Sequence, residues 1–170
     1  MLELTPYGAQ TVDPSEHYPT SVCELLTRLN APVHLIDPNF SDTAEFAERY
    51  HVPLERCLNA LLVETKIEGE RQPRLVMVPA HRRIGNSALK KALGGKSSFM
   101  PADRALELTG MQQGAVTPIG LPPEIPIALD SQALTEDSYI IGGQDRSLKI
   151  EVPQESLQAL ADIDYQGLYS

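Results

Sequence analysis

Apolar residues recur along this chain in short blocks, and the spacing within each block separates helices from strands. Spacings of three and four residues are typical of a helix with one buried face, whereas short runs of β-branched and other apolar residues favour strands. The predicted helices cover residues 21–29, the segment from 42 to 50, residues 86–93, residues 102–108 and the segment that follows Pro153. The predicted strands cover residues 33–36, 57–63, 75–78, 96–100, 125–129, 139–141 and 147–152.

Polar residues, glycine and proline mark the ends of these elements. Ser41 or Asp42 is suited to cap the second helix, and Asn86 the third, because a short polar side chain can accept a hydrogen bond from the first helical turn. Gly69 lies in a polar stretch that predicts a hairpin or loop, and the Gly142–Gly143 pair predicts a turn. Residues 1–16 carry prolines and glycine without periodicity and are expected to be an irregular lead-in.

Some strands follow one another directly, and others are separated by helices. This order predicts an α+β fold in which helices pack on a mixed sheet. A length of 170 residues is enough for one domain, and no repeat divides it, so we expect a single domain over residues 1–170.

The composition is that of a soluble globular protein, with 42% hydrophobic and 22% charged residues. No apolar run is long enough for a membrane span, and the first residues do not resemble a secretory signal, so the cytoplasm is the expected compartment. Cys23 and Cys57 lack metal-ligand spacing and lie in apolar segments, which indicates two buried thiols.

Charge is distributed unevenly along the chain. The formal net charge of −9 argues against a general nucleic-acid binder, because neutralising phosphates requires basic surface. Residues 66–104, however, hold nine of the fourteen basic residues and only three acidic ones. This basic segment is either a solvated surface or a local site for a few phosphates, such as those of a tRNA acceptor end.

The densest pattern of special residues is a loop between a predicted helix and a predicted strand. Residues 109–122, with the sequence TGMQQGAVTPIGLP, place three glycines and two prolines within fourteen positions. Proline stiffens such a loop, and glycine lets its backbone approach another group closely. Its free N–H and C=O groups could therefore bind a ligand without any side chain.

This loop, followed by an apolar strand that ends in Asp130, resembles the YbaK/prolyl-tRNA editing family, whose members hydrolyse mischarged aminoacyl-tRNA. Residues 79–94 (PAHRRIGNSALKKALG) and 96–101 (KSSFMP) also match segments of that family. The resemblance covers about residues 40–160. It implies a barrel-like sheet surrounded by helices, and a mischarged tRNA acceptor end as the partner. An aminoacyl-tRNA synthetase is a further partner that the resemblance leaves open.

The resemblance also implies site residues. The family lysine that is thought to bind the terminal nucleotide is replaced here by Asn59, which offers an amide but no charge. Asp130 matches a family aspartate that would hold the substrate's amino group or orient water. Gly114 is assigned to the catalytic set through its backbone. The residues expected to bind substrate are Thr109, Gly110, Thr117, Pro118 and Gly120 of the loop and the basic residues Lys96, Arg82 and Arg83.

Three of these positions have simpler alternatives. Asn59 can be a strand residue satisfied by neighbouring backbone, and Asp130 can cap the turn at Ser131. Lys96 is the candidate for a replacement cation, with surface exposure as the alternative. The four histidines lie in separate segments, so neither a zinc site nor a Ser-His-Asp triad is predicted, and no phosphate-binding glycine motif occurs.

The sequence therefore predicts a free-standing aminoacyl-tRNA deacylase that needs no cofactor. Water would be the nucleophile, and the terminal ribose hydroxyl of the substrate would assist. The alternative, favoured by Asn59, is a catalytically silent module of the same fold that binds aminoacyl-tRNA, a synthetase or a nucleotide-like ligand. Hydrolysis of another small acyl ester is a third, weaker reading.

Overall fold

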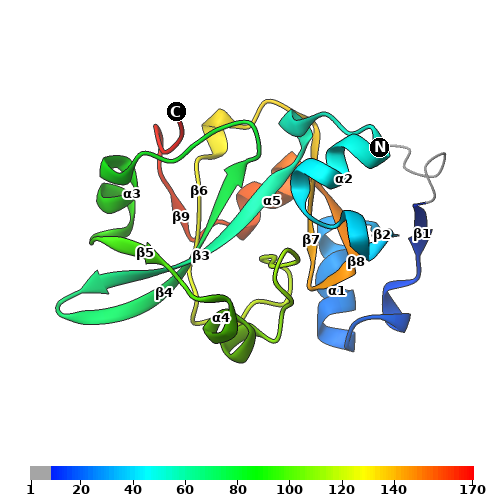
Figure 1. The fold of residues 1–170 in the computed structure, drawn as a ribbon, viewed down its shortest axis with the longest axis horizontal. Helices are drawn as coiled ribbons and strands as arrows, with labels where there is room; N and C mark the ends of the chain where they lie inside the picture. The colour runs from blue at the N-terminus through cyan, green and yellow to red at the C-terminus, as the bar shows by residue number, and fades with distance from the viewer. Residues whose placement is uncertain (1–8) are drawn as a thin grey trace.

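The computed structural model describes residues 9–170, which form two β-sheets with helices around them (Figure 1). The helices in this part of the chain are α1 (Thr20–Leu29), α2 (Thr43–Tyr50), α3 (Asn86–Leu93), α4 (Ala102–Thr109) and α5 (Gln154–Leu160). The strands are β1 (Gln10–Val12), β2 (Val33–Leu35), β3 (Leu58–Ile67), β4 (Glu70–Pro79), β5 (Ser97–Phe99), β6 (Ile127–Leu129), β7 (Ser138–Gly143), β8 (Asp145–Pro153) and β9 (Ile163–Asp164). Four short 3-10 turns, η2 (Pro14–Glu16), η3 (Pro38–Phe40), η4 (Leu54–Arg56) and η5 (Ser131–Ala133), lie between them.

The strands form one sheet of order β1-β2-β8-β7 and another of order β5-β3-β4-β6-β9. The pairs β4–β6 and β6–β9 are parallel and the other pairs are antiparallel, so the predicted mixed sheet and α+β class are confirmed. A bridge between Cys57 and Ile140 brings the start of β3 to β7, where the two sheets meet. The largest hydrophobic cluster takes side chains from both sheets, as the core of a barrel does.

A long hairpin of β3 and β4 forms the middle of the second sheet. Glu68 and Gly69 connect the strands with φ values of 51° and 83°, the positive values that a two-residue hairpin turn of the primed type needs. Gly69 thus lies in a hairpin turn, one of the two structures predicted for it. The strands are longer than predicted because backbone pairing continues over polar residues as far as the pair Ile67 and Glu70.

Several element ends differ from the sequence predictions. Gly85, and not Asn86, is the N-cap of α3, and no side chain caps that helix. Gly142 and Gly143 lie within β7, and the turn to β8 is made by Gln144 with a φ of 75°. The physical reason is packing: a Cβ on Gly142 would lie 2.7 Å from the carbonyl oxygen of Val116.

The start of the chain also differs from its prediction. Part of the expected irregular lead-in, residues 1–8, lies outside the described residues. Residues 10–12 form β1, because they pair with β2 through tertiary contacts that local periodicity does not reveal. Of the two cysteines predicted to be buried, Cys57 is buried and Cys23 is only partly buried, because it lies toward the edge of the inward face of α1.

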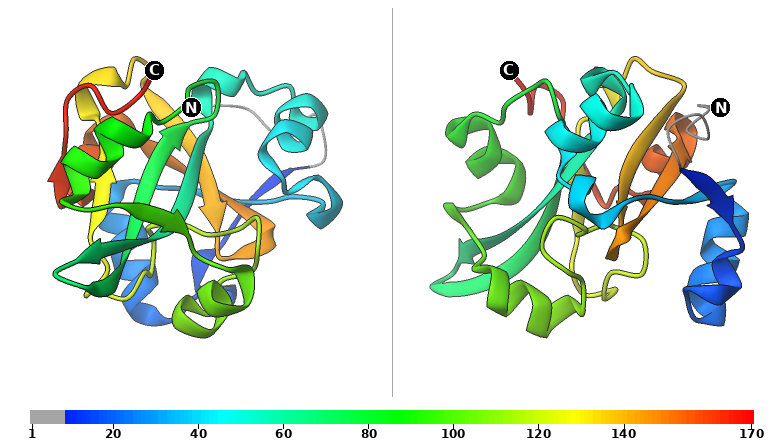
Figure 2. Two further views of the ribbon diagram at one scale, coloured as in Figure 1. Left: turned by 60° about the vertical axis from the view of Figure 1, so that its left-hand side comes forward. Right: turned by 45° about the vertical axis from the view of Figure 1, so that its right-hand side comes forward.

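The helices and the glycine-proline loop enclose one region beside the junction of the two sheets. In Figure 1 and in both views of Figure 2, α2 lies toward the top and α4 toward the bottom, and the start of the loop rises between them. Phe46 and Ala47 of α2 pack with Cys57 and Ile140 in a second hydrophobic cluster at that junction. This arrangement frames the candidate site.

Candidate active site

A cavity of about 410 Å³ lies between α2, the first half of β3, α4, the glycine-proline loop and the β7–β8 pair. Most of its lining residues have apolar side chains, and polar side chains and backbone groups are exposed on the wall among them. Its lining residues are Asp42, Thr43, Phe46, Cys57, Leu58, Asn59, Ala60, Leu61, Leu62, Phe99, Met100, Ala102, Ala105, Met111, Gln113, Gly114, Val116, Ile140, Ile141, Gly142 and Lys149. A cavity of this size that combines apolar side chains with several polar groups is typical of a small-ligand site.

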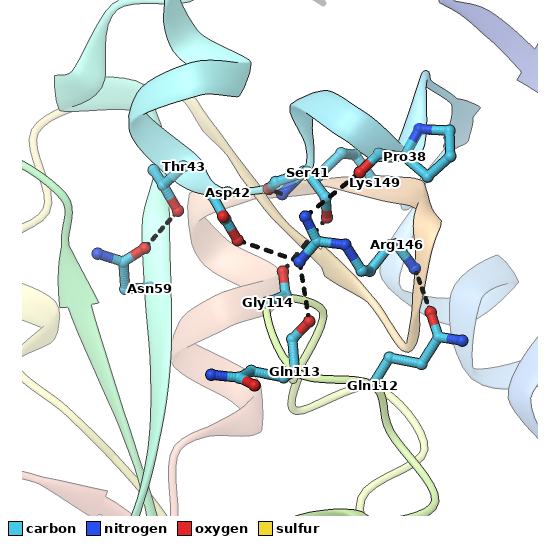
Figure 3. Close-up of polar contacts among 10 residues, drawn as sticks. All are labelled: Pro38, Ser41, Asp42, Thr43, Asn59, Gln112, Gln113, Gly114, Arg146 and Lys149. Carbon is cyan, nitrogen blue, oxygen red and sulfur yellow. Dashed lines mark hydrogen bonds and ion pairs between the residues drawn. The ribbon is translucent and has the colours of Figure 1, made fainter. Parts of the chain in front are cut away.

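Asn59 lines the cavity from β3, as its assignment to the site requires. Its Oδ1 accepts a hydrogen bond of 2.5 Å from the Thr43 hydroxyl on α2 (Figure 3). Within residues 9–170 its Nδ2 makes no hydrogen bond, so both N–H groups remain free to donate. The structure therefore fixes the orientation of this amide and leaves its donor side free.

A buried cation lines the same cavity from β8. Lys149 is only 4% exposed, and its Nζ donates a hydrogen bond of 2.6 Å to the carbonyl oxygen of Ser41, just before α2. The ammonium also lies 5.0 Å from the centre of the Phe46 ring, within the range of a cation–π contact. The pKa of Lys149 is lowered to about 8, mainly by burial; Cys57 and Asp42 oppose this shift, and the nearby Arg146 adds to it.

Lys149 is a site residue that the sequence analysis missed. It stands between Leu148 and Ile150 in an apolar strand, so alternation places it on the opposite face from those core residues. A lysine at such a position is ordinarily solvated. The sequence signal for Lys149 is a charged residue within a strand, flanked by apolar residues. Its burial, however, depends on the packing of α2 against that face of β8.

The glycine-proline loop is held against α2 by one arginine. Arg146, just after the β7–β8 turn, donates from Nη1 to Asp42 Oδ1 at 3.1 Å and to the carbonyl oxygen of Gln113 at 3.0 Å (Figure 3). Its Nη2 donates to the carbonyl oxygen of Pro38, and its backbone N–H donates to the side chain of Gln112. This cluster, which we call the Arg146 clamp, fixes the loop at the edge of the cavity.

Gly114 lies under the clamp and has a φ of 83°, a conformation that favours glycine. A Cβ at this position would lie 2.8 Å from Asp42 Oδ1 and would also collide with the guanidinium of Arg146. The carbonyl oxygen of Gly114 accepts a hydrogen bond from the Ser41 hydroxyl. Gly114 therefore lines the cavity through its backbone alone, as its assignment to the site assumed.

The other predicted loop residues lie outside the set that lines the cavity. Thr109 and Gly110 end α4: the Thr109 hydroxyl bonds the carbonyl of Ala105, and Gly110 is the left-handed C-cap. Thr117 and Pro118 are buried, and Gly120, with a φ of 79°, faces Gln144 and Val22. Their assigned role in substrate binding stays a prediction.

Asp130 is likewise not among the residues that line the cavity. Its carboxylate is 3% exposed, and its Oδ2 accepts hydrogen bonds from the backbone N–H groups of Gly167 and Leu168. Its own backbone N–H donates to the Tyr169 hydroxyl. The observed contacts of Asp130 thus anchor the C-terminal segment, and a role toward the substrate's amino group stays a prediction.

Of the three basic residues predicted to bind substrate, one makes hydrogen bonds within the protein and two are exposed to solvent. Arg82 donates to the backbone carbonyls of Tyr169 and Ser170, whereas Arg83 and Lys96 are exposed. None of these three lines the cavity within the described part of the chain. Glu64, which lies just outside the basic segment, forms ion pairs with Arg71 and Arg104 and so removes part of its positive charge.

One exposed aromatic residue stands at the edge of the cavity. Phe99 of β5 is 76% exposed and belongs to the lining set. Only Leu54 and Leu106 are comparable exposed large hydrophobic residues in the region that the structure describes, and neither lines the cavity.

No group of three or more metal-ligating side chains comes together within residues 9–170. In the same residues, no helix is long and apolar enough to cross a membrane.

Comparison with known proteins identifies the family of this chain. The aminoacyl-tRNA editing domain family matches residues 37–160, and the chain therefore belongs to that family. A protein of Enterococcus faecalis (strain ATCC 700802 / V583) named "Putative Cys-tRNA(Pro)/Cys-tRNA(Cys) deacylase EbsC" is 28% identical over 91 residues. That match covers 53% of this chain and spans 56% of the length of the relative.

Solved structures show the same fold at low identity. A "putative trans-editing enzyme for prolyl tRNA synthetase" superposes with a TM-score of 0.69 and 19% identity, over 86% of this chain and 98% of the other. The hypothetical protein APE2540 gives a TM-score of 0.75 and 20% identity, over 86% of this chain and 97% of that one. These likenesses establish the fold of the editing domain, with the cavity described above at its sheet junction.

Proposed function

We propose that this protein is a free-standing deacylase that hydrolyses the ester bond of a mischarged aminoacyl-tRNA. The observation that carries the proposal is the cavity: it is about 410 Å³ in volume and combines apolar side chains with free polar donors, in a chain of the editing-domain family. Such a cavity suits a small aminoacyl group on a terminal adenosine. The relative from Enterococcus faecalis makes Cys-tRNA(Pro) and Cys-tRNA(Cys) the first substrates to test.

The edge of the cavity supports a nucleotide ligand. An exposed aromatic ring can stack on a nucleobase, and each such contact typically contributes ~1–3 kcal/mol. Phe99 offers this surface at the edge of the cavity, and it belongs to the basic segment of residues 66–104. We propose that the terminal base of the tRNA stacks on Phe99 while the aminoacyl group enters the cavity.

In this proposal water attacks the ester carbonyl carbon, and the ribose oxygen leaves. Among the lining residues in the described part of the chain, the ionisable side chains are Asp42, Cys57 and Lys149. Asp42 is bound by Arg146, and burial raises the pKa of the Cys57 thiol to about 11. Neither is suited to act as a strong general base near neutral pH, so a substrate hydroxyl would assist the water.

The test is deacylation of a panel of mischarged tRNAs by the purified protein. The panel contains Ala-, Cys- and Ser-tRNA(Pro) together with Cys-tRNA(Cys), and spontaneous hydrolysis is measured in parallel. The variant Ala60→Trp, which would fill the cavity, should abolish hydrolysis, whereas Ala159→Trp on the exposed face of α5 should not. A wild-type rate equal to the spontaneous rate on every tRNA would contradict the proposal.

The second candidate is a silent binding module, and Asn59 favours it. An uncharged amide stands where the family resemblance expects a lysine, and an amide cannot neutralise a phosphate or an oxyanion as an ammonium does. Retained binding of aminoacyl-tRNA without hydrolysis, in the same panel, would support this alternative.

A further inference from the structure

Lys149 is the one cation among the described residues that line the cavity. It projects from β8, and its antiparallel partners are His34 on β2 and Gly142 on β7. Gly142 has no side chain, and the loop backbone at Ala115 and Val116 approaches it there. The lysine side chain therefore runs along a face that α2 and the loop cover, and it ends at the cavity.

The ammonium of Lys149 has unused donors. A lysine ammonium carries three N–H groups. Within residues 9–170 its hydrogen bonding is limited to the carbonyl oxygen of Ser41 at 2.6 Å, with the face of Phe46 on another side. Two donors thus remain for a molecule in the cavity.

The charge of Lys149 also lacks a direct counter-ion. Its neighbours with ionisable groups are Asp42 just before α2, Cys57 just before β3, Arg146 and the buried Glu151 on its own strand, and His34 on β2. Glu151 Oε1 lies 3.5 Å from His34 Nε2. Asp42 is held by Arg146 at 3.1 Å, and no carboxylate lies within ion-pair distance of Nζ in the part of the chain described. A buried cation without a partner is costly, so an oxygen-bearing ligand would relieve it.

The competing explanation for the buried Lys149 is structural: its ammonium would serve only to hold the carbonyl oxygen of Ser41 in place. A hydroxyl or amide side chain would serve that purpose without the cost of burying a charge. The unused donors and the position in the cavity wall go beyond what such a structural contact requires. The same position faces the ligand volume together with the free amide of Asn59.

We propose that Lys149 contacts the substrate and holds the ester carbonyl oxygen of the aminoacyl group, taking the place of the cation that residue 59 lacks. This inference rests on the proposed deacylase function. As the water oxygen bonds to the carbonyl carbon, the π electron pair of the C=O bond moves to the carbonyl oxygen. The ammonium of Lys149 stabilises the negative charge that develops on this carbonyl oxygen. Collapse of the adduct breaks the bond to the ribose oxygen, which takes up the proton that the water gives up.

The kinetic test uses three variants and the mischarged tRNA that the wild type hydrolyses fastest. Lys149→Met keeps the length and apolar stem and removes the charge, so kcat should fall about 100- to 1,000-fold with KM changed only a few-fold. Lys149→Arg keeps a cation and should retain part of the activity. Arg28→Met removes an exposed cation on α1 and should leave kcat unchanged.

The pH profile supplies a readout that a purely structural role would not give. With a pKa of about 8 in the free protein, the ammonium of Lys149 is present below that pH and is lost above it. After subtraction of spontaneous hydrolysis, kcat/KM of the wild type should fall as pH rises through about 8. Lys149→Arg should lack this decline, because arginine keeps its charge.

A binding measurement on the wild type avoids dependence on how well the variants fold. A non-hydrolysable aminoacyl-adenosine, with an amide in place of the ester, is titrated into protein labelled with ¹⁵N at lysine side chains. Binding should raise the pKa of Lys149, since a carbonyl oxygen favours the charged form.

The outcomes separate the two proposals. An active wild type whose kcat is unchanged in Lys149→Met, or is lost in Lys96→Met instead, overturns the assignment of Lys149 and leaves the deacylase function standing. Binding of the analogue without a change in the pKa of Lys149 overturns it as well. A wild type that neither hydrolyses the panel nor binds the analogue overturns the proposed function, and the assignment of Lys149 with it.

Discussion

The two halves of the glycine-proline loop each contain one glycine with positive φ and have different surroundings. Residues 112–116 lie at the edge of the cavity, where Gln113 and Gly114 are exposed and the Arg146 clamp holds them. Residues 117–121 enter the hydrophobic core, where Ile119 is fully buried. Glycine with positive φ occurs in both halves, so backbone conformation alone does not indicate which half serves the site.

This comparison shows that a glycine-rich loop can divide its roles along its length. The second half packs into the protein interior and sets the position of the loop. The first half borders the cavity, with its shape imposed by the side chains of Ser41 and Asp42, which lie between η3 and α2, and of Arg146 on β8. The loop can therefore be tested by substitutions that affect one half and spare the other.

The largest expected effect is on stability, from the second half of the loop. Ile119 is 0% exposed, and Ile119→Ala should lower the free energy of unfolding by about 2–5 kcal/mol, because it removes buried methyl groups and leaves a cavity. Thermal and denaturant unfolding measure this change. Deacylation per folded molecule should stay close to wild type at low temperature, and a loss of kcat in well-folded protein would break the division between the halves.

Gly114→Val and Gly120→Val form a matched pair, because their φ values of 83° and 79° give nearly equal backbone strain. In each variant the valine is forced into the left-handed region, which should lower the free energy of unfolding by ~1–2 kcal/mol. Only Gly114→Val should also lower kcat/KM, by about 10- to 100-fold, because its side chain displaces the clamp at the cavity. Equal rates in the two variants, with unfolding monitored by circular dichroism, would contradict the comparison.

Across the cavity from the loop, Asn59→Ala tests the donor that faces the substrate. Loss of one or two polar contacts worth ~1.5–3 kcal/mol should reduce the deacylation rate about 10- to 100-fold. Thr43→Val is the companion variant, because it removes the hydroxyl that orients Asn59 and should have a smaller effect of the same kind. A wild-type rate in Asn59→Ala would remove this residue from the site.

Phe99→Ala addresses the edge of the cavity, and its effect should fall on binding. Loss of a stacking contact of ~1–3 kcal/mol would raise KM about 5- to 100-fold with little change in kcat. Phe99 is 76% exposed, so the stability of the variant should be nearly that of the wild type. Leu106→Ala, an exposed apolar residue of α4 outside the cavity, is the control.

The smallest expected effect concerns the clamp itself. Arg146→Met removes the hydrogen bonds to Asp42 and to the carbonyl of Gln113, while the core half of the loop stays anchored. Surface ion pairs contribute little stability, typically ~0–1 kcal/mol, so the unfolding midpoint should scarcely move. A few-fold decrease in kcat/KM is expected from a less well-placed Gly114.

Periodicity identified most of the elements, because helix and strand spacing reflect which face of each element is buried. It failed where a contact from elsewhere in the chain decided the outcome. β1 forms through pairing with β2, and Gly142 is needed for close packing against Val116 and lies within a strand. Of the residues assigned to the site from the sequence, Asn59 and Gly114 line the cavity, whereas Lys149 reaches it only because α2 covers that face of β8.

The sequence by itself determined the family and the mixed α+β order, and it placed a hairpin or loop around Gly69. Each of these depends on local backbone preference or on periodicity, which neighbouring residues carry. The tertiary structure alone decided which charges became buried and what they face. Lys149 and Asp130 both lie in or at the end of apolar strands, but one ends at a cavity with unused donors and the other accepts backbone N–H groups of the C-terminal segment. Lys149 contacts Ser41, which is 108 residues away in the chain, and Asp130 contacts Gly167, which is 37 residues away. No local sequence pattern encodes contacts between residues so far apart.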